Sequence, residues 1–308
     1  MSVEITLERD GVRMNIGEKI RSLRVAKLMT QSELAGNQIT RNMLSSIENG
    51  VAQPSLSTIL YIAKRLNVPV GFLLAEEGDE IIYQKMNSLS NIKRAYRTGD
   101  WMGCRSLCNS ACSEPDDEIR LLLAECDLQI AIDAFWNGRL RYACRFFDEA
   151  LLYAKETLYP TQHILAQAKL YFRYMQRISP TLDSNVLDGL EVTEFFCYTP
   201  FSLYLETIES LEKDENKAIT DFNEAFPQEN GFFSLHLQAK YLMLRSGYEG
   251  AKKLLLSLLQ SDEVSLNEIS LYAVLCDLEI CCRETDDFKG AYRYSNEKVA
   301  ILEQLLKD

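Results

Sequence analysis

The chain has 308 residues, of which 47% are apolar and 25% are charged, a composition typical of globular proteins and not of disordered ones. This length favours two domains over one. No apolar run approaches the ~20 residues of a membrane helix, and the N-terminal MSVEITLERDG is polar and acidic where a secretory signal would be basic and then apolar, so we expect a cytoplasmic protein without membrane contacts.

Charge divides the chain into two unequal parts. The net charge is −12, but residues 1–75 hold nine Lys/Arg against six Asp/Glu, a net charge of +3. The remaining residues hold 24 basic and 39 acidic side chains, a net charge of −15. A mildly basic head on a strongly acidic body favours a head that meets a polyanion.

The nine cysteines are odd in number and scattered, and we expect them to stay reduced. The closest sets are Cys104, Cys108 and Cys112, and the adjacent Cys281 and Cys282. His163 and His236 are the only histidines, which leaves no spacing typical of a metal site, so we expect no metal and no cofactor. Packing as small apolar residues is the role that we predict for the thiols.

The head begins with a predicted helix whose apolar stripe is Ile16, Ile20, Leu23 and Leu28. The segment TQSE then predicts a capping box, in which Thr30 and Glu33 satisfy each other's backbone amides. Leu34 and Ala35 give this second helix a small apolar face, and Gly36 ends it because glycine tolerates a positive φ.

The third predicted helix is polar on the side that faces away from the core. Thr40 is the expected N-cap, Leu44 and Ile47 face inward, and Asn49-Gly50 ends the helix. Four outward side chains follow from this arrangement: Arg41, Asn42, Ser45 and Ser46. Arginine and asparagine form the bidentate hydrogen bonds that read guanine and adenine, and Gln31 lies at a helix N-terminus, where a phosphate is favoured.

Two more helices complete the head. Ser55 starts the fourth, whose predicted stripe is Leu56, Ile59, Ile62, Ala63 and Leu66, and NVPVGFLL closes the unit. Five short helices with this spacing predict a helix-turn-helix, whose polar helix enters a major groove. The alternative is a helical bundle with no role in nucleic-acid binding, used only as an interaction scaffold.

Residues 16–74 resemble the Cro/phage-repressor (Xre) family, through TQSELA, ITRNMLSSIENG and PSLSTILYIAKRLNVPV. The resemblance implies a lambda-repressor-like fold, base contacts from Arg41, Asn42 and Ser46, and operator contacts from Gln31, Thr40 and Asn49. It also implies a buried ion pair between Arg24 and Glu48. The turn before the third helix is one residue shorter than in the phage repressors and is similar to that of Rgg/PlcR regulators.

The body shows a repeat with a period near 37 residues. Gly138, Ala143, Phe147 and Ala150 have the spacing of the second helix of a tetratricopeptide-like hairpin. The equivalent small residues are Cys104, Ala143, Ala218, Ala251 and Ala291, and in the last two units the pattern begins at Gly247 and Asp287. A degenerate unit around residues 179–196 completes about six hairpins, which we expect to stack into an α-superhelix.

The first helices of the hairpins supply the candidate groove of that superhelix. Polar and aromatic side chains there could hold an extended peptide, although ordinary solvated faces have the same composition. The candidates are Gln129, Asp133, Asn137, Gln167, Arg173, Tyr174, His236, Gln238, Lys240 and Tyr241.

The two parts together resemble the peptide-responsive Rgg/PlcR regulators of Gram-positive bacteria. The resemblance implies a DNA-binding domain at 1–75, with its core at 16–74, and a tetratricopeptide-like domain at 76–308 that dimerises and binds a short signalling peptide. Its partners would be duplex DNA, a second copy and that peptide. The alternative is a regulator whose body is a constitutive dimerisation or docking scaffold. An enzyme is not expected, because no phosphate loop or histidine-centred constellation is present.

Overall fold

The computed structural model describes residues 15–75, 79–111, 114–184, 186–187, 199–212, 218–225, 231–260 and 266–307. Every regular element within these ranges is an α-helix, which confirms the predicted all-α class. The chain divides into two compact units: the head unit, residues 1–99 with 106–114, and the body unit, residues 100–105 with 115–308. The functional boundary between residues 75 and 76 stays a prediction.

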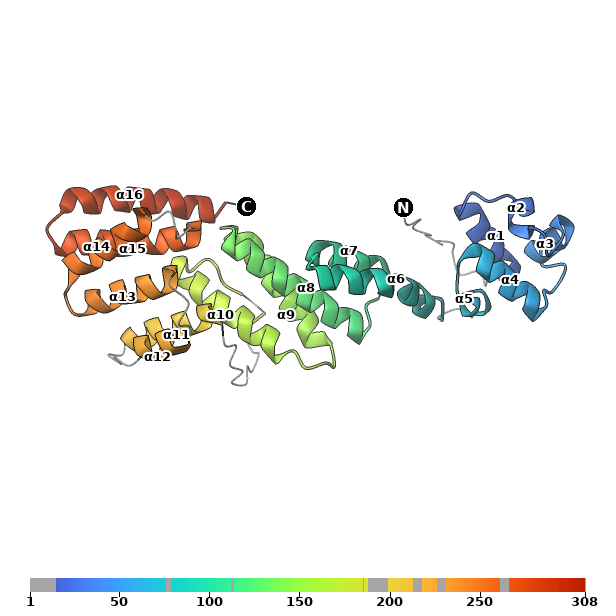
Figure 1. The fold of residues 1–308 in the computed structure, drawn as a ribbon, viewed down its shortest axis with the longest axis horizontal. Helices are drawn as coiled ribbons and strands as arrows, with labels where there is room; N and C mark the ends of the chain where they lie inside the picture. The colour runs from blue at the N-terminus through green and yellow to red at the C-terminus, as the bar shows by residue number, and fades with distance from the viewer. Residues whose placement is uncertain are drawn as a thin grey trace. The chain divides into compact units, whose positions relative to one another are not determined.

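The head contains the five predicted short helices, followed by a longer one (Figure 1). Their bounds are α1 (Ile16–Ala26), α2 (Gln31–Ala35), α3 (Arg41–Glu48), α4 (Leu56–Leu66), α5 (Val70–Leu74) and α6 (Asp79–Thr98). One apolar cluster joins α1 to α5, and Ile20, Leu34, Leu44, Ile62 and Leu66 are each 0% exposed at its centre. These side chains recur at helical spacing, so burying one face of each helix closes the unit.

The predicted caps are present. The Thr30 hydroxyl accepts a hydrogen bond from the Glu33 amide at 3.2 Å, and the Glu33 carboxylate accepts one from the Thr30 amide at 2.6 Å. Thr40 accepts from the Met43 amide at 3.1 Å. Gly36 has φ +55°, as its predicted role in ending α2 requires.

Two apolar residues of the predicted stripes are not in the core. Leu28 is 92% exposed, because α1 ends at Ala26 and the chain reverses there with φ +55° at Leu28. Leu56 is 64% exposed, because it is the first residue of α4, before the helix reaches the core. A regular helical period therefore overestimates the buried stripe at both positions.

One head glycine was not singled out by the sequence patterns. A Cβ on Gly17 would lie 2.0 Å from the Ile47 carbonyl oxygen, so α1 and α3 cross at a distance that only glycine permits. This crossing fixes the position of α3 against α1.

The remaining helices run from α7 to α16, and three consecutive pairs of them form hairpins. Their bounds are α7 (Trp101–Ala111), α8 (Asp117–Trp136), α9 (Leu140–Glu156), α10 (Gln162–Ile178), α11 (Pro200–Glu212), α12 (Ala218–Ala225), α13 (Phe232–Leu244), α14 (Tyr248–Gln260), α15 (Glu268–Glu284) and α16 (Phe288–Leu305). In the body unit α8 packs on α9, α13 on α14 and α15 on α16. None of the helices in the described ranges is long and apolar enough to cross a bilayer.

The turn inside a hairpin repeats its geometry. Gly99, Gly138, Ser246 and Asp286 all have a φ between +60° and +74°, and each lies two residues before a second helix. In the last two units this turn residue lies one position before Gly247 and Asp287, where the sequence pattern begins. Five residues after each turn residue comes one of the predicted small residues, Cys104, Ala143, Ala251 or Ala291, of which the first three are 0% exposed.

The predicted degenerate hairpin is accounted for only in part. Its first helix corresponds to α10, which packs on α8 and α9. The second helix of this hairpin is predicted at residues 179–196, and of these, residue 185 and residues 188–196 lie outside the described residues.

One buried apolar cluster of the body extends from α8 to α16, and a second joins α13, α14, α15 and α16. Ile269 of α15 and Leu305 of α16 belong to the same buried cluster as Phe135 of α8. At the α8–α9 turn, a Cβ on Gly138 would meet the Glu268 carboxylate at 2.3 Å, so segments distant in sequence pack closely there.

Candidate functional site

Helix α3 presents its polar face to solvent. Leu44 and Ile47 are 0% and 1% exposed and anchor the helix to the head core. Arg41, Asn42 and Asn49 are exposed, while Ser45 and Ser46 are half-buried on the flank of the same face. These are the outward residues that the sequence predicted, together with the N-cap Thr40 at the start of the helix.

Met43 is an additional residue of this face. It is 40% exposed and lies between Asn42 and Leu44, where the helical period alone placed no contact residue. Any duplex that approaches α3 would meet this flexible apolar side chain beside the polar ones.

A buried ion pair fixes α3 to α1 and α2. Arg24 of α1 donates to Glu48 through Nε at 2.7 Å and through Nη2 at 3.0 Å, so the pair expected from the resemblance is present as a bidentate contact. Arg24 also donates to the Met29 carbonyl oxygen at 2.8 Å. Burial raises the pKa of Glu48, but hydrogen bonds from Arg24 and Gln31 outweigh it and leave that pKa below its ordinary value.

Gln31 has a structural partner that the sequence did not indicate. Its Nε2 donates to Glu48 Oε2 at 2.9 Å, so its amide supports the ion pair beneath α3. The operator contact that the resemblance implies for Gln31 stays a prediction, and with this geometry the backbone and the outer edge of the side chain would have to make it.

Other exposed cations of the head belong to α1 and α4. Among described residues 15–75, Arg21, Lys64 and Arg65 are exposed, in addition to Arg41. Arg65 donates to the Glu33 carbonyl oxygen, which holds its guanidinium at the end of α2.

The predicted groove residues of the body fall into three groups. Asp133, Asn137, Arg173 and Gln238 are exposed, and Gln129, Gln167, Lys240 and Tyr241 are half-buried. Tyr174 and His236 are 8% and 2% exposed, so the prediction that they line an open groove is wrong for these two. The aromatic ring of Tyr174 packs edge-on against Phe135, and the imidazole of His236 stacks on Phe232.

His236 belongs to a buried polar chain that connects three helices. Its Nδ1 lies 2.8 Å from the Tyr204 hydroxyl of α11, and its Nε2 lies 3.0 Å from Asp277 Oδ2 of α15. The Lys240 ammonium donates to the other carboxylate oxygen, Oδ1, at 2.7 Å. Burial raises the pKa of Asp277, but His236 and Lys240 reverse this, and the resulting pKa lies below its ordinary value.

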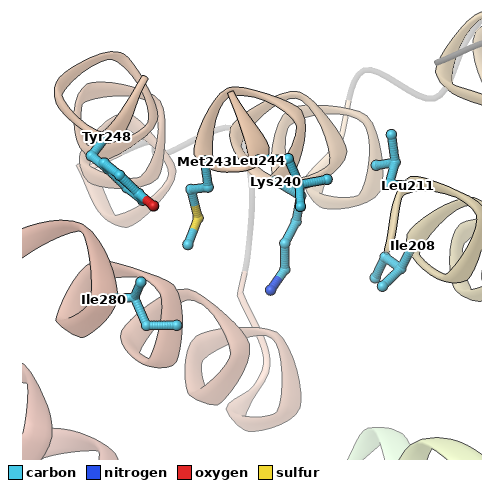
Figure 2. Close-up of a pocket in the computed structure, with 7 residues that line it drawn as sticks. All are labelled: Ile208, Leu211, Lys240, Met243, Leu244, Tyr248 and Ile280. Atoms are coloured by element: carbon cyan, nitrogen blue, oxygen red, sulfur yellow. The ribbon is translucent and has the colours of Figure 1, made fainter. Parts of the chain in front are cut away.

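A pocket of about 340 Å³ in the body unit includes Lys240, the exposed end of these buried polar contacts, in its lining (Figure 2). Four helices contribute its described lining residues, which are Ile208, Leu211, Lys240, Met243, Leu244, Tyr248 and Ile280. Of these, the sequence analysis predicted only Lys240 as a groove residue. Figure 2 shows the Lys240 side chain extending between Ile208 on one side and Met243 with Ile280 on the other. No local pattern in the sequence indicates this site, because its lining residues lie up to 72 positions apart.

The cysteines of the described ranges are packed or half-packed. Cys104, Cys108, Cys281 and Cys282 are each 0% exposed. Burial raises the pKa of Cys281 to about 12, which opposes thiolate formation. Within the same ranges no group of three or more His, Cys, Asp or Glu side chains is placed to hold a metal ion.

Comparison with known proteins identifies the head. Residues 20–73 match a protein family described as "Helix-turn-helix", and α1 to α5 in this range form a domain of that kind. No curated protein matches the chain. The identification of the head therefore rests on the family match and on the geometry of its five helices.

Similar solved structures cover almost the whole chain at low identity. PlcR of Bacillus thuringiensis in complex with the peptide PapR7 and DNA is 14% identical, covering 96% of this chain and 99% of that chain with a TM-score of 0.25. ComR from S. thermophilus in complex with DNA and its signalling peptide ComS is 17% identical, covering 93% and 99% with a TM-score of 0.22. The apo form of the competence regulator ComR from Streptococcus vestibularis is 19% identical, covering 93% and 97% with a TM-score of 0.21.

Proposed function

We propose that this protein is a sequence-specific DNA-binding transcriptional regulator whose body dimerises and senses a short peptide. The observation that carries the DNA-binding half is the outward polar face of α3, with Arg41 and Asn42 exposed above a buried Leu44 and Ile47. A helix held this way can enter a major groove without disturbing its own domain.

The base-reading roles go to Arg41, Asn42 and Ser46, with Ser45 beside them, and the backbone contacts to Gln31, Thr40 and Asn49. Arginine and asparagine offer two hydrogen bonds to one base edge, and each good pair contributes about 1–3 kcal/mol of discrimination. The net charge of residues 1–75 is only +3, so phosphate contacts alone would hold one head weakly. A dimer that reads two half-sites is the arrangement that compensates for this.

The peptide-sensing role of the body rests on the sequence resemblance to the Rgg/PlcR group and on the apolar pocket beside Lys240. We assign the body no catalytic role. In this proposal residues 1–75 bind DNA and residues 76–308 carry dimerisation and peptide binding.

The first experiment selects operator sequences from genomic fragments with the full-length protein and then measures affinity by fluorescence anisotropy. Arg41→Ala and Asn42→Ala are each expected to weaken binding by about 5- to 150-fold, the equivalent of one lost bidentate contact. Arg141→Ala and Asn296→Ala, exposed residues of the same types in α9 and α16, are matched controls. Unchanged affinity in both α3 variants would overturn the assignment of α3 as the recognition helix.

The peptide role has its own test. The protein is purified from its native cells, and retained small peptides are identified by mass spectrometry. Two results together would favour a constitutive scaffold instead. The purified protein would retain no peptide, and it would bind the operator equally with and without cell extract.

A further inference from the structure

We propose that the pocket beside Lys240 binds the C-terminal residue of a peptide, taking a bulky apolar side chain into the pocket and its free carboxylate to the Lys240 ammonium. This inference rests on the proposed peptide-sensing function and names the chemistry by which one subsite would recognise its ligand.

The walls of the pocket are apolar and only partly covered. Ile208 and Leu211 of α11 form a buried wall at 7% and 4% exposure. Leu244 of α13 and Ile280 of α15, which also line the pocket, are 55% and 39% exposed. Filling the space between them with an apolar group would remove these surfaces from water, which is favourable in proportion to the area covered.

One charged group faces this apolar space. Among the described lining residues only Lys240 carries a charge, and its side chain is 31% exposed. An ammonium has three N–H donors, and the Asp277 carboxylate accepts from one of them at 2.7 Å. The Asp277 carboxylate itself is 2% exposed and is also contacted by His236, so it anchors the lysine without reaching the ligand space. Donors of Lys240 therefore remain for a second acceptor.

The volume of the pocket and the chemistry of its lining residues together favour the C-terminal residue of a peptide. About 340 Å³ is near the lower limit of small-ligand sites and holds one large side chain with its backbone, not a whole peptide. An apolar side chain and a carboxylate on the same residue occur together only at the C-terminus of a peptide. Tyr248 of α14 lies at the same pocket, where its hydroxyl offers an additional hydrogen bond.

Methyl NMR on the full-length protein provides the test. The protein is labelled on Ile and Met methyl groups, so that Ile208, Ile280 and Met243 report from the pocket itself. The probe is N-acetyl-Ala-Ala-Ala-Leu with a free carboxylate, and the comparison probes are its C-terminal amide and the same acid ending in Ala. We expect the acid to shift these methyl signals with roughly millimolar affinity and both comparison probes to bind about tenfold more weakly.

Two variants separate charge from shape. Lys240→Met is expected to abolish the difference between the acid and the amide, whereas Lys252→Met, a lysine of α14 paired with Asp287, should retain it. Lys240→Met also removes the ammonium partner of the buried Asp277 carboxylate and could disturb the fold. A second variant therefore keeps the contact between Lys240 and Asp277. Leu244→Trp places an indole at the exposed mouth of the pocket and is expected to reduce binding of the acid at least about tenfold, while Leu152→Trp, 49% exposed on α9, should not.

Equal affinity for the acid and the amide, or unchanged binding in Leu244→Trp, would overturn the inference. Operator binding is measured on the same samples. If DNA binds normally and the probes do not shift the pocket methyls, the subsite is wrong while the regulator proposal stands. If the probes bind as expected and DNA does not, the regulator proposal fails separately.

Discussion

Replacing Arg24 by alanine tests how the head holds its recognition helix. In the variant, the Glu48 carboxylate, whose side chain is 1% exposed, loses both arginine hydrogen bonds and keeps only the one from Gln31. Removing one partner of a buried ion pair typically costs about 3–5 kcal/mol, because the remaining charge stays buried and unpaired. A small domain is stable by only about 5–15 kcal/mol, so most of the stability of the head would be lost.

The assay is hydrogen exchange of the full-length protein followed by mass spectrometry, read on peptides from α1, α2 and α3. Arg24→Ala should lower the free energy of opening of these helices by about 3 kcal/mol or more and leave the body peptides unchanged. Arg65→Ala is the matched control, because this exposed arginine makes one hydrogen bond, to the Glu33 carbonyl oxygen. Its expected effect is below about 1 kcal/mol.

The apolar double variant Arg24→Met with Glu48→Met should recover much of the loss, since well-packed apolar pairs replace buried ion pairs at little cost. The pH dependence follows from the lowered pKa of Glu48: its contribution is complete above the ordinary value of 4.5 and is lost as the pH falls through the lower folded-state pKa. An opening free energy that changes by less than about 1 kcal/mol in Arg24→Ala would refute this reasoning.

Three further outcomes follow from the structure. Gly17→Ala should destabilise α1 and α3 by roughly 2 kcal/mol or more, measured by the same exchange, because its Cβ would lie 2.0 Å from the Ile47 carbonyl oxygen. If only the four exposed cations among described residues 15–75 contact phosphates, eight in a dimer, the affinity for the operator should fall with salt with a logarithmic slope of about −7, and a steeper slope would mean that other residues also contact DNA. Cys281 and Cys282, both 0% exposed, should react with a thiol reagent at least about 100-fold more slowly in the native protein than in the unfolded one, as followed by peptide mapping, and rapid native labelling would contradict their packing.

Local patterns predicted the head well because its determinants are local. The Thr30 capping box, the Thr40 cap and the buried Leu44 and Ile47 depend on residues within one or two helical turns, and each is present. The errors at Leu28 and Leu56 have the same origin: periodicity identifies a helical face, but not where the helix ends relative to the core.

In the body, the sequence determined where the second helices begin, since the small residues at Cys104, Ala143 and Ala251 follow their turns at a fixed distance. It did not determine which side chains line a site. The buried chain through Tyr204, His236 and Asp277 joins residues up to 73 positions apart, and no local spacing encodes that meeting.

The sequence by itself thus determined the helices, their caps and the polar face of α3, because hydrogen bonds and apolar spacing act between near neighbours. Only the tertiary structure decided that His236 and Tyr174 are buried and that Lys240 faces an apolar pocket. Burial depends on how distant helices pack together, and a single helix does not carry that information.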